Sequence, residues 1–111
     1  MTDWALRRMR YQQDSAAIQL GGLASNLSRI AWCAQREDRQ QALPMFRESK
    51  YFTEWAAASC PTDQQTVLAE LQLQLASWER GWGGRWSPAR IAEEAQKWSS
   101  RLLEATGFVA R

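Results

Sequence analysis

One helix ends and another begins within Trp78-Glu79-Arg80-Gly81-Trp82-Gly83-Gly84-Arg85-Trp86-Ser87-Pro88-Ala89-Arg90. Gly83 and Gly84 supply the permissive backbone that a chain needs to leave a helix. Ser87 and Pro88 are typical of a helix start, because serine caps the first N–H groups and proline suits the first helical position. We therefore interpret residues 78–90, which hold three of the seven tryptophans, as the turn of a helical hairpin.

Apolar residues spaced alternately by three and four positions predict buried helical faces on either side of this turn. We expect helices over residues 14–38, over residues 43–58 with Pro44 in the first turn, from Thr62 to the turn, and from Pro88 onward. Thr62 and Gln65 have the spacing of a capping box, and Gly107 suits a C-terminal cap on which Phe108 folds back. The three clearest stripes are Ala16, Leu20, Leu23, Leu27, Ile30 and Ala34; Leu68, Leu71, Leu75, Trp78 and Trp82; and Ile91, Ala95, Trp98, Leu102 and Ala105.

A row of small residues runs beside the first stripe. It comprises Ala17, Gly21, Ala24, Ser28 and Ala31. Small side chains let another helix approach closely, which predicts tight packing along this row. The alternative is that Gly21-Gly22 bends or breaks the helix.

These patterns predict a single all-α domain over residues 14–108, a four-helix up-down antiparallel bundle. Residues 1–13 form a basic N-terminal arm, either flexible or a helical extension, since Leu6, Met9 and Gln13 continue the register of the first helix. Outside this arm the basic and acidic residues balance. Neither a membrane span nor a secretory signal is present in the sequence, so we expect a cytoplasmic protein.

The residue inventory argues against catalysis. There is no histidine, the commonest general base and metal ligand. Gly81-Trp82-Gly83-Gly84 lacks the lysine and preceding strand of a phosphate loop. Cys33 and Cys60 are too few for a disulfide scaffold or a four-thiolate zinc site. We expect no enzymatic activity, metal or cofactor.

The turn is the first candidate for a partner surface, through Arg80, Trp82, Arg85 and Trp86, because tryptophan and arginine are enriched at binding hot spots. Alternatively, the indoles plug the end of the bundle and the arginines cover them. Trp78 belongs to the core in either case, and Trp86 is the better surface candidate.

Two further segments could bind partners. Tyr51 and Trp55 lie in an aromatic-rich helix that suits a dimer or ligand surface, unless these rings are core. In the arm, Arg7, Arg8 and Arg10 stand near aromatic residues, a combination that can bind phosphates and stack on bases. Three arginines are also common in a solubilising terminus.

Three segments resemble small helical proteins of cyanobacteria that have no assigned activity. They are Leu23-Ala24-Ser25-Asn26-Leu27-Ser28-Arg29-Ile30-Ala31-Trp32, Glu48-Ser49-Lys50-Tyr51-Phe52-Thr53-Glu54-Trp55 and Leu71-Gln72-Leu73-Gln74-Leu75-Ala76-Ser77-Trp78. The resemblance spans residues 16–108 and implies a cytoplasmic protein of a photosynthetic bacterium. It implies no functional residues.

The first functional hypothesis is a non-enzymatic helical interaction or adaptor protein, with a homodimer compatible with it. One alternative is a bundle that binds a small apolar ligand or pigment between its helices. The other is nucleic-acid binding through the arm, which the near-neutral remainder of the chain disfavours.

Overall fold

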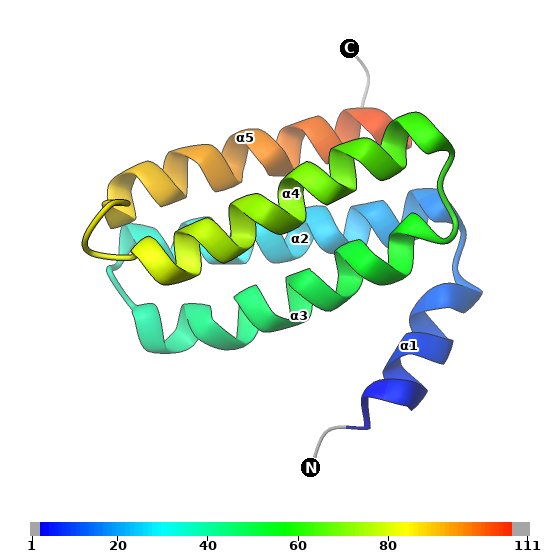
Figure 1. Ribbon diagram of the computed structural model, residues 1–111, viewed down its shortest axis with the longest axis horizontal. Helices are drawn as coiled ribbons and strands as arrows, with labels where there is room; N and C mark the ends of the chain where they lie inside the picture. Colours follow the sequence, from blue (N-terminus) through cyan, green and yellow to red (C-terminus); the bar gives the residue numbers. More distant parts are fainter. Residues whose placement is uncertain (1–2, 108–111) are drawn as a thin grey trace.

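The computed structural model describes residues 3–107, and the secondary structure of these residues is helical (Figure 1). The five helices are α1 (Trp4–Gln13), α2 (Ala16–Gln35), α3 (Arg39–Ala57), α4 (Thr62–Gly81) and α5 (Pro88–Thr106). The all-α prediction is therefore confirmed. The predicted number of helices is wrong, because residues 4–13 form a helix of their own.

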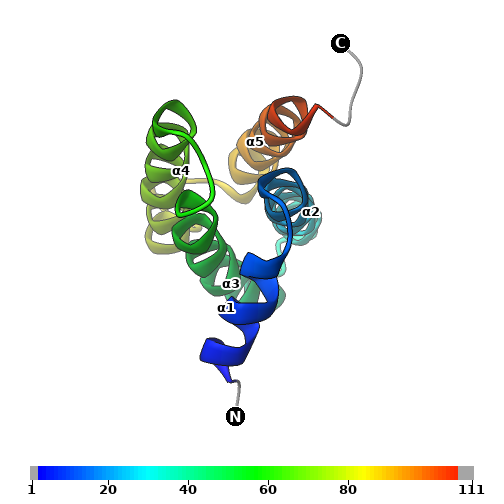
Figure 2. The same cartoon turned by 90° about the vertical axis from the view of Figure 1, so that its right-hand side faces the viewer.

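The predicted N-terminal arm is a capped helix that docks on the other helices. Asp3 caps α1 by accepting a hydrogen bond from the N–H of Leu6 at 3.0 Å. Ser15 caps α2 in the same way, accepting from the N–H of Ile18 at 3.3 Å. Because Ser15 has extended backbone angles, α1 and α2 are separate helices rather than one continuous helix. Figure 2 shows α1 outside the four longer helices, beside α3.

The predicted start of the helix over residues 43–58 is wrong, and the predicted capping box of Thr62 and Gln65 is not formed, although α4 does begin at Thr62. Helix α3 begins at Arg39, since the Asp38 carboxylate accepts the N–H of Gln41 at 3.1 Å, and Pro44 therefore lies inside the helix. Thr62 is the first residue of α4 and not its cap. The Gln65 amide donates instead to the carbonyls of the preceding turn, at 3.0 Å to Ala57 and 3.0 Å to Cys60.

The predicted ends of α5 are confirmed. The Ser87 hydroxyl accepts the N–H of Arg90 at 3.2 Å, and Pro88 occupies the first helical position. Gly107 caps the helix with a left-handed backbone, φ +76°. Phe108, predicted to fold back on the last turn, lies outside the described residues.

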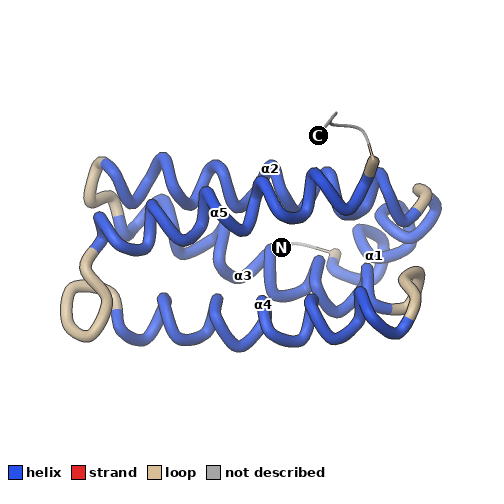
Figure 3. Tube along the Cα trace, turned by 90° about the horizontal axis from the view of Figure 1, so that it is seen from above, coloured by secondary structure: helices blue, strands red, loops and turns tan. Residues whose placement is uncertain are grey.

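Helix α2 lies between α3 and α5, and α4 packs on α3 (Figure 2). Seen from above, the four longer helices run alongside one another, with α2 and α4 on opposite sides (Figure 3). Trp78 and the predicted apolar stripes meet between these four helices, which confirms Trp78 as core. The largest fully buried apolar side chains are Leu23, Leu27, Ile30, Phe46, Leu68, Leu71, Leu75, Trp78 and Ile91.

The middle of the small-residue row packs closely on another helix, as predicted, and that helix is α5. The Ser99 hydroxyl donates to the carbonyl of Ala24 at 2.8 Å, and its oxygen lies 2.9 Å from that of Ser28. A side chain can reach the backbone of a neighbouring helix in this way only when the two helices are close. At Gly21 an added Cβ would meet no atom within 4 Å, so the predicted close packing does not extend to that glycine. Helix α2 continues through Gly21 and Gly22, so the glycines do not break it.

Among residues 3–107, none of the helices combines the length and apolar character needed to cross a membrane.

Candidate partner-binding site

The turn between α4 and α5 is tightly closed by backbone hydrogen bonds. The N–H groups of Gly84 and Trp86 both donate to the carbonyl of Gly81, each at 2.9 Å. The N–H of Gly83 donates to the carbonyl of Trp86 at 2.9 Å, and Gly83 has a φ of +80° that favours glycine. The turn therefore holds Trp86 in a defined position against α4.

Trp86 packs inward, onto the last turns of α4. Its indole N–H donates to the Ser77 hydroxyl at 3.0 Å, and its ring lies edge-on to Trp78 with centroids 6.2 Å apart. The guanidinium of Arg90 lies 4.7 Å from the centroid of the Trp86 ring. Half-buried Trp86 thus contributes to the end of the core, and the Arg90 guanidinium stacks on it.

The other three predicted turn residues come together in one surface groove of about 570 Å³. Arg80, Trp82 and Arg85 line it, together with Leu73 from the middle of α4. The Trp82 ring meets Phe46 of the core edge-on, with centroids 6.2 Å apart. Trp82 is therefore anchored and half-buried, while both arginines are exposed. We call this groove, lined by Leu73, Arg80, Trp82 and Arg85, the α4 groove.

Leu73 is 75% exposed, which is unusual for a large apolar side chain in the middle of a helix. By its apolar character alone, Leu73 would be assigned to a widened buried face of α4. However, each residue of a helix is rotated by about 100° from the one before it. Leu73, two residues after buried Leu71, therefore points about 200° away from Leu71 and faces away from the core. This offset from the stripe is the signal that identifies Leu73 as a surface residue.

Arg80 and Arg85 form no ion pair with any described residue, whereas other basic side chains of the surface do. Arg80 lies in the last turn of α4, where a positive charge also stabilises the negative end of the helix dipole. Both guanidinium groups therefore keep their hydrogen-bonding capacity for a partner. A surface with carboxylates and an apolar side chain would complement this groove.

The aromatic face of α3 is covered by the chain itself. Trp4 of α1 stacks on Tyr51 at a centroid distance of 4.3 Å, and Tyr11 stacks on Phe52 at 4.3 Å. Trp55 lies beneath both α1 rings and is 4% exposed. Trp55 is therefore not available to a partner while α1 is in place, because the predicted surface already has an intramolecular partner.

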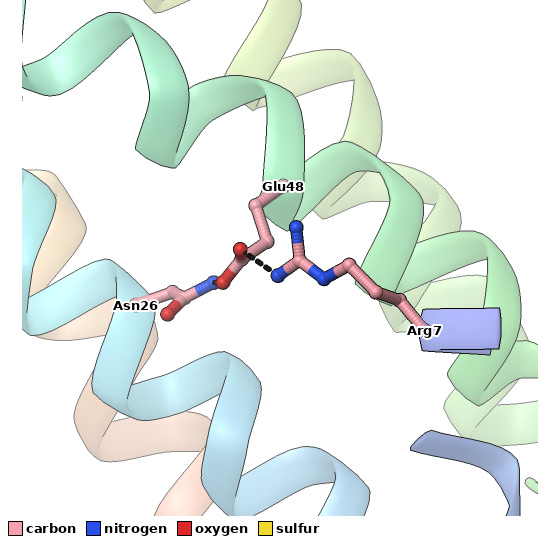
Figure 4. A network of polar contacts seen from close by, with 3 residues as sticks. All are labelled: Arg7, Asn26 and Glu48. Atoms are coloured by element: carbon pink, nitrogen blue, oxygen red, sulfur yellow. Dashed lines mark hydrogen bonds and ion pairs between the residues drawn. The ribbon is translucent and has the colours of Figure 1, made fainter. Parts of the chain in front are cut away.

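A polar network centred on Glu48, which the sequence pattern does not identify, fixes α1 on α3. The Glu48 side chain is only 17% exposed and pairs with Arg7 of α1 (Figure 4). Its other oxygen accepts the amide N–H of buried Asn26 at 3.0 Å. Asn26 shares a helical row with Leu23 and Ile30, and a polar residue in such a row is the signal for a buried partner.

The three arginines of α1 differ in their contacts. Arg7 pairs with Glu48 and also lies 4.7 Å from the Trp4 centroid. Arg8 donates to Gln12 on its own helix at 3.4 Å. Arg10 is exposed. The arginine with the most contacts thus serves to dock α1.

Both cysteines are buried free thiols, one on α2 and the other just beyond α3. Burial raises the pKa of each thiol, and nearby Asp38 and Asp63 add to this for Cys33 and Cys60 respectively. A raised pKa keeps a thiol protonated and weakly nucleophilic. Within residues 3–107, no group of three or more acidic, cysteine or histidine side chains is placed to hold a metal ion.

No protein-family model, curated protein or solved structure matches the chain. The resemblance to cyanobacterial helical proteins therefore stays an expectation. Function has to be argued from the geometry of the surface.

Proposed function

We propose that this chain is a non-enzymatic interaction protein that binds a protein partner through the α4 groove. The observation that carries the proposal is the exposed Leu73 in one groove with anchored Trp82 and two unpaired arginines. Burying an exposed leucine contributes about 1.5–3 kcal/mol. Tryptophan and arginine are the side chains that most often dominate interface energies.

The scaffold we propose for this site is a cytoplasmic four-helix up-down bundle formed by α2 to α5, with α1 as a fifth, covering helix. In this proposal the bundle keeps the residues of the α4 groove in fixed positions. Trp86 supports the end of α4 from inside, and the tight turn directs Arg85 to the groove rim. The side chains of the groove then lose little conformational entropy when a partner binds, which favours affinity. A second copy of the chain is one partner that this proposal admits.

The two alternative functions have less support. The space between the longer helices is filled by bulky side chains such as Trp78 and Phe46, which leaves apolar ligands less room than the bundle alternative needs. For nucleic-acid binding through α1, Arg7 is engaged by Glu48, which leaves Arg8 and Arg10 as the exposed basic side chains of that helix.

Affinity capture from cells that carry the gene tests the proposal with two matched variants. Leu73→Ser removes the exposed side chain of the groove, and Ile18→Ser removes one that is 51% exposed at the start of α2. We expect a defined protein to bind the wild type and the Ile18 variant, and to be lost from the Leu73 variant. Equal capture by all three would contradict the proposal. Sedimentation equilibrium of the same proteins shows whether the partner is a second copy.

A further inference from the structure

A second groove lies on another pair of helices, between the end of α2 and the start of α3. Its volume is about 500 Å³, and its lining residues are Arg29, Trp32, Cys33, Gln40, Gln41, Pro44 and Met45. It shares no residue with the α4 groove. We call it the α2–α3 groove.

Trp32 gives this groove an exposed aromatic wall. The Trp32 side chain is 49% exposed, although it belongs to a helix whose other large apolar side chains are mostly buried. The guanidinium of Arg36 lies 3.7 Å from the centroid of its ring, and Arg36 also donates to the Trp32 carbonyl at 3.4 Å. One face of the indole is thus backed by a cation, which contributes about 0.5–1 kcal/mol at an exposed site and orients the ring.

Pro44 and Met45 form the apolar α3 side of the groove. Met45 is unbranched and flexible, so it supplies an adaptable apolar surface. Together with Trp32, these residues offer a partner an apolar area on both sides of the groove.

The charge of the groove specifies its occupant. Arg29 is the charged lining residue, and its guanidinium pairs with no described residue; the side-chain amides of Gln40 and Gln41 are also unpaired. Asp38 lies near Cys33, but its carboxylate is engaged as the cap of α3. With Arg36 at the rim, a bound segment would face two guanidinium groups and one apolar wall.

We infer that the α2–α3 groove is a second docking site, for an acidic peptide segment that inserts one large apolar side chain beside Trp32 and Met45. Carboxylates on either side of that side chain would pair with Arg29 and Arg36. The groove is open along the surface, which suits a chain segment better than a small molecule that needs most of its area buried. Two separate grooves would let the chain join two partners, and this second site does not depend on the α4 groove.

Selection of a phage-displayed library of random linear peptides on the full chain tests this inference. We expect enrichment of peptides with one large apolar residue flanked by Asp or Glu. Their synthetic versions should bind at least about tenfold more weakly to Trp32→Ala and to Arg29→Glu, and normally to Leu73→Ser. Arg29 is exposed, so its variant reports on binding even if the Trp32 variant folds poorly.

Three results would overturn the inference. One is the absence of acidic residues in the enriched peptides, or of any enrichment. Another is binding that Leu73→Ser abolishes and Trp32→Ala does not, which would assign the peptides to the α4 groove. The third is a homodimer in sedimentation equilibrium that Arg29→Glu dissociates, because a second copy would then occupy the α2–α3 groove.

Discussion

Replacing Gly81 by alanine should destabilise the protein, although alanine is the better helix former. A Cβ at position 81 would lie 2.9 Å from Cδ1 of Trp86 and 3.4 Å from Cβ of Arg85. Carbon atoms pack best at about 3.5–4.0 Å, so the indole would have to retreat. It cannot do so freely, because its N–H is bound to Ser77 and its edge rests on Trp78.

The magnitude follows from two opposing terms. Overpacking a fixed site costs about 1–3 kcal/mol. Replacing a helical glycine by alanine returns about 0.5–1 kcal/mol. Because the Cβ would come within 3.0 Å of an anchored ring, the overpacking cost should lie in the upper part of its range, about 2–3 kcal/mol. We expect a net loss of about 1–2.5 kcal/mol in the free energy of unfolding, with roughly 4–8 °C in Tm for each kcal/mol. Urea unfolding followed by circular dichroism should show a lower midpoint with an unchanged slope.

Two control variants make this prediction specific. Gly84→Ala should be nearly neutral, because its Cβ would meet only the Gly81 carbonyl at an ordinary 3.7 Å. In a Trp86→Ala background, Gly81→Ala should lose its cost, since no ring is left to displace. The proposed clash between a Cβ at position 81 and the Trp86 ring would be refuted by a Gly81→Ala protein as stable as the wild type. It would also be refuted if Gly81→Ala still lowered stability in the Trp86→Ala background.

Glu48→Ala should cost about 1–3 kcal/mol, because it leaves the buried amide of Asn26 without its acceptor. Hydrogen exchange should also rise across α1, whereas Glu54→Ala on the exposed side of α3 should change neither quantity. Burial raises the pKa of Tyr11 above its ordinary value of 10.0. The contribution of Tyr11 to stability should therefore be complete below about pH 10 and fall as pH rises further, since this tyrosine then releases a proton in the unfolded chain and retains it in the folded chain. Tyr11→Phe should flatten this fall in pH-dependent urea titrations; an unchanged fall would contradict it. Cys33 and Cys60 should react slowly with iodoacetamide near pH 8 in the folded protein and rapidly in urea, as mass spectrometry can follow; fast alkylation of native protein would show that they are not buried.

Much of the fold is predictable because local chemistry and long-range packing agree. The apolar stripes, the close packing in the middle of the small-residue row, and the Ser87 and Gly107 caps all follow from periodicity and capping rules. The same rules fail where two signals compete. Asp38 caps α3 upstream of Pro44, and Gln65 reaches back to the preceding turn instead of forming a capping box.

The docking of α1 could not be predicted, because it depends on tertiary contacts between short segments. None of its residues is fully buried, so its apolar pattern is weak. Trp4 and Tyr11 find their partners on α3, and Arg7 finds Glu48, far along the sequence. These contacts convert the aromatic face of α3 from a predicted binding surface into an internal interface.

The candidate site was predicted in part, since Arg80, Trp82 and Arg85 do meet in one groove. Trp86 does not line the groove; it packs against α4 and donates a hydrogen bond to Ser77. Leu73, the most exposed large apolar side chain of the described residues, was not among the predicted site residues. Its offset from buried Leu71 and Leu75 marks it as a surface residue, but the sequence does not show that it lies in one groove with Trp82 and the two arginines.

Site-specific photo-cross-linking in native cells tests the central claim most directly. A photoreactive amino acid is placed at position 73, in the α4 groove, or at position 18 as an equally apolar exposed control. We predict a covalent adduct with one defined protein from position 73 and none from position 18. Arg80→Glu with Arg85→Glu should abolish it, because the partner's carboxylates would then be repelled. No adduct at position 73, or the same adducts from both positions, would contradict a partner-binding role for the groove.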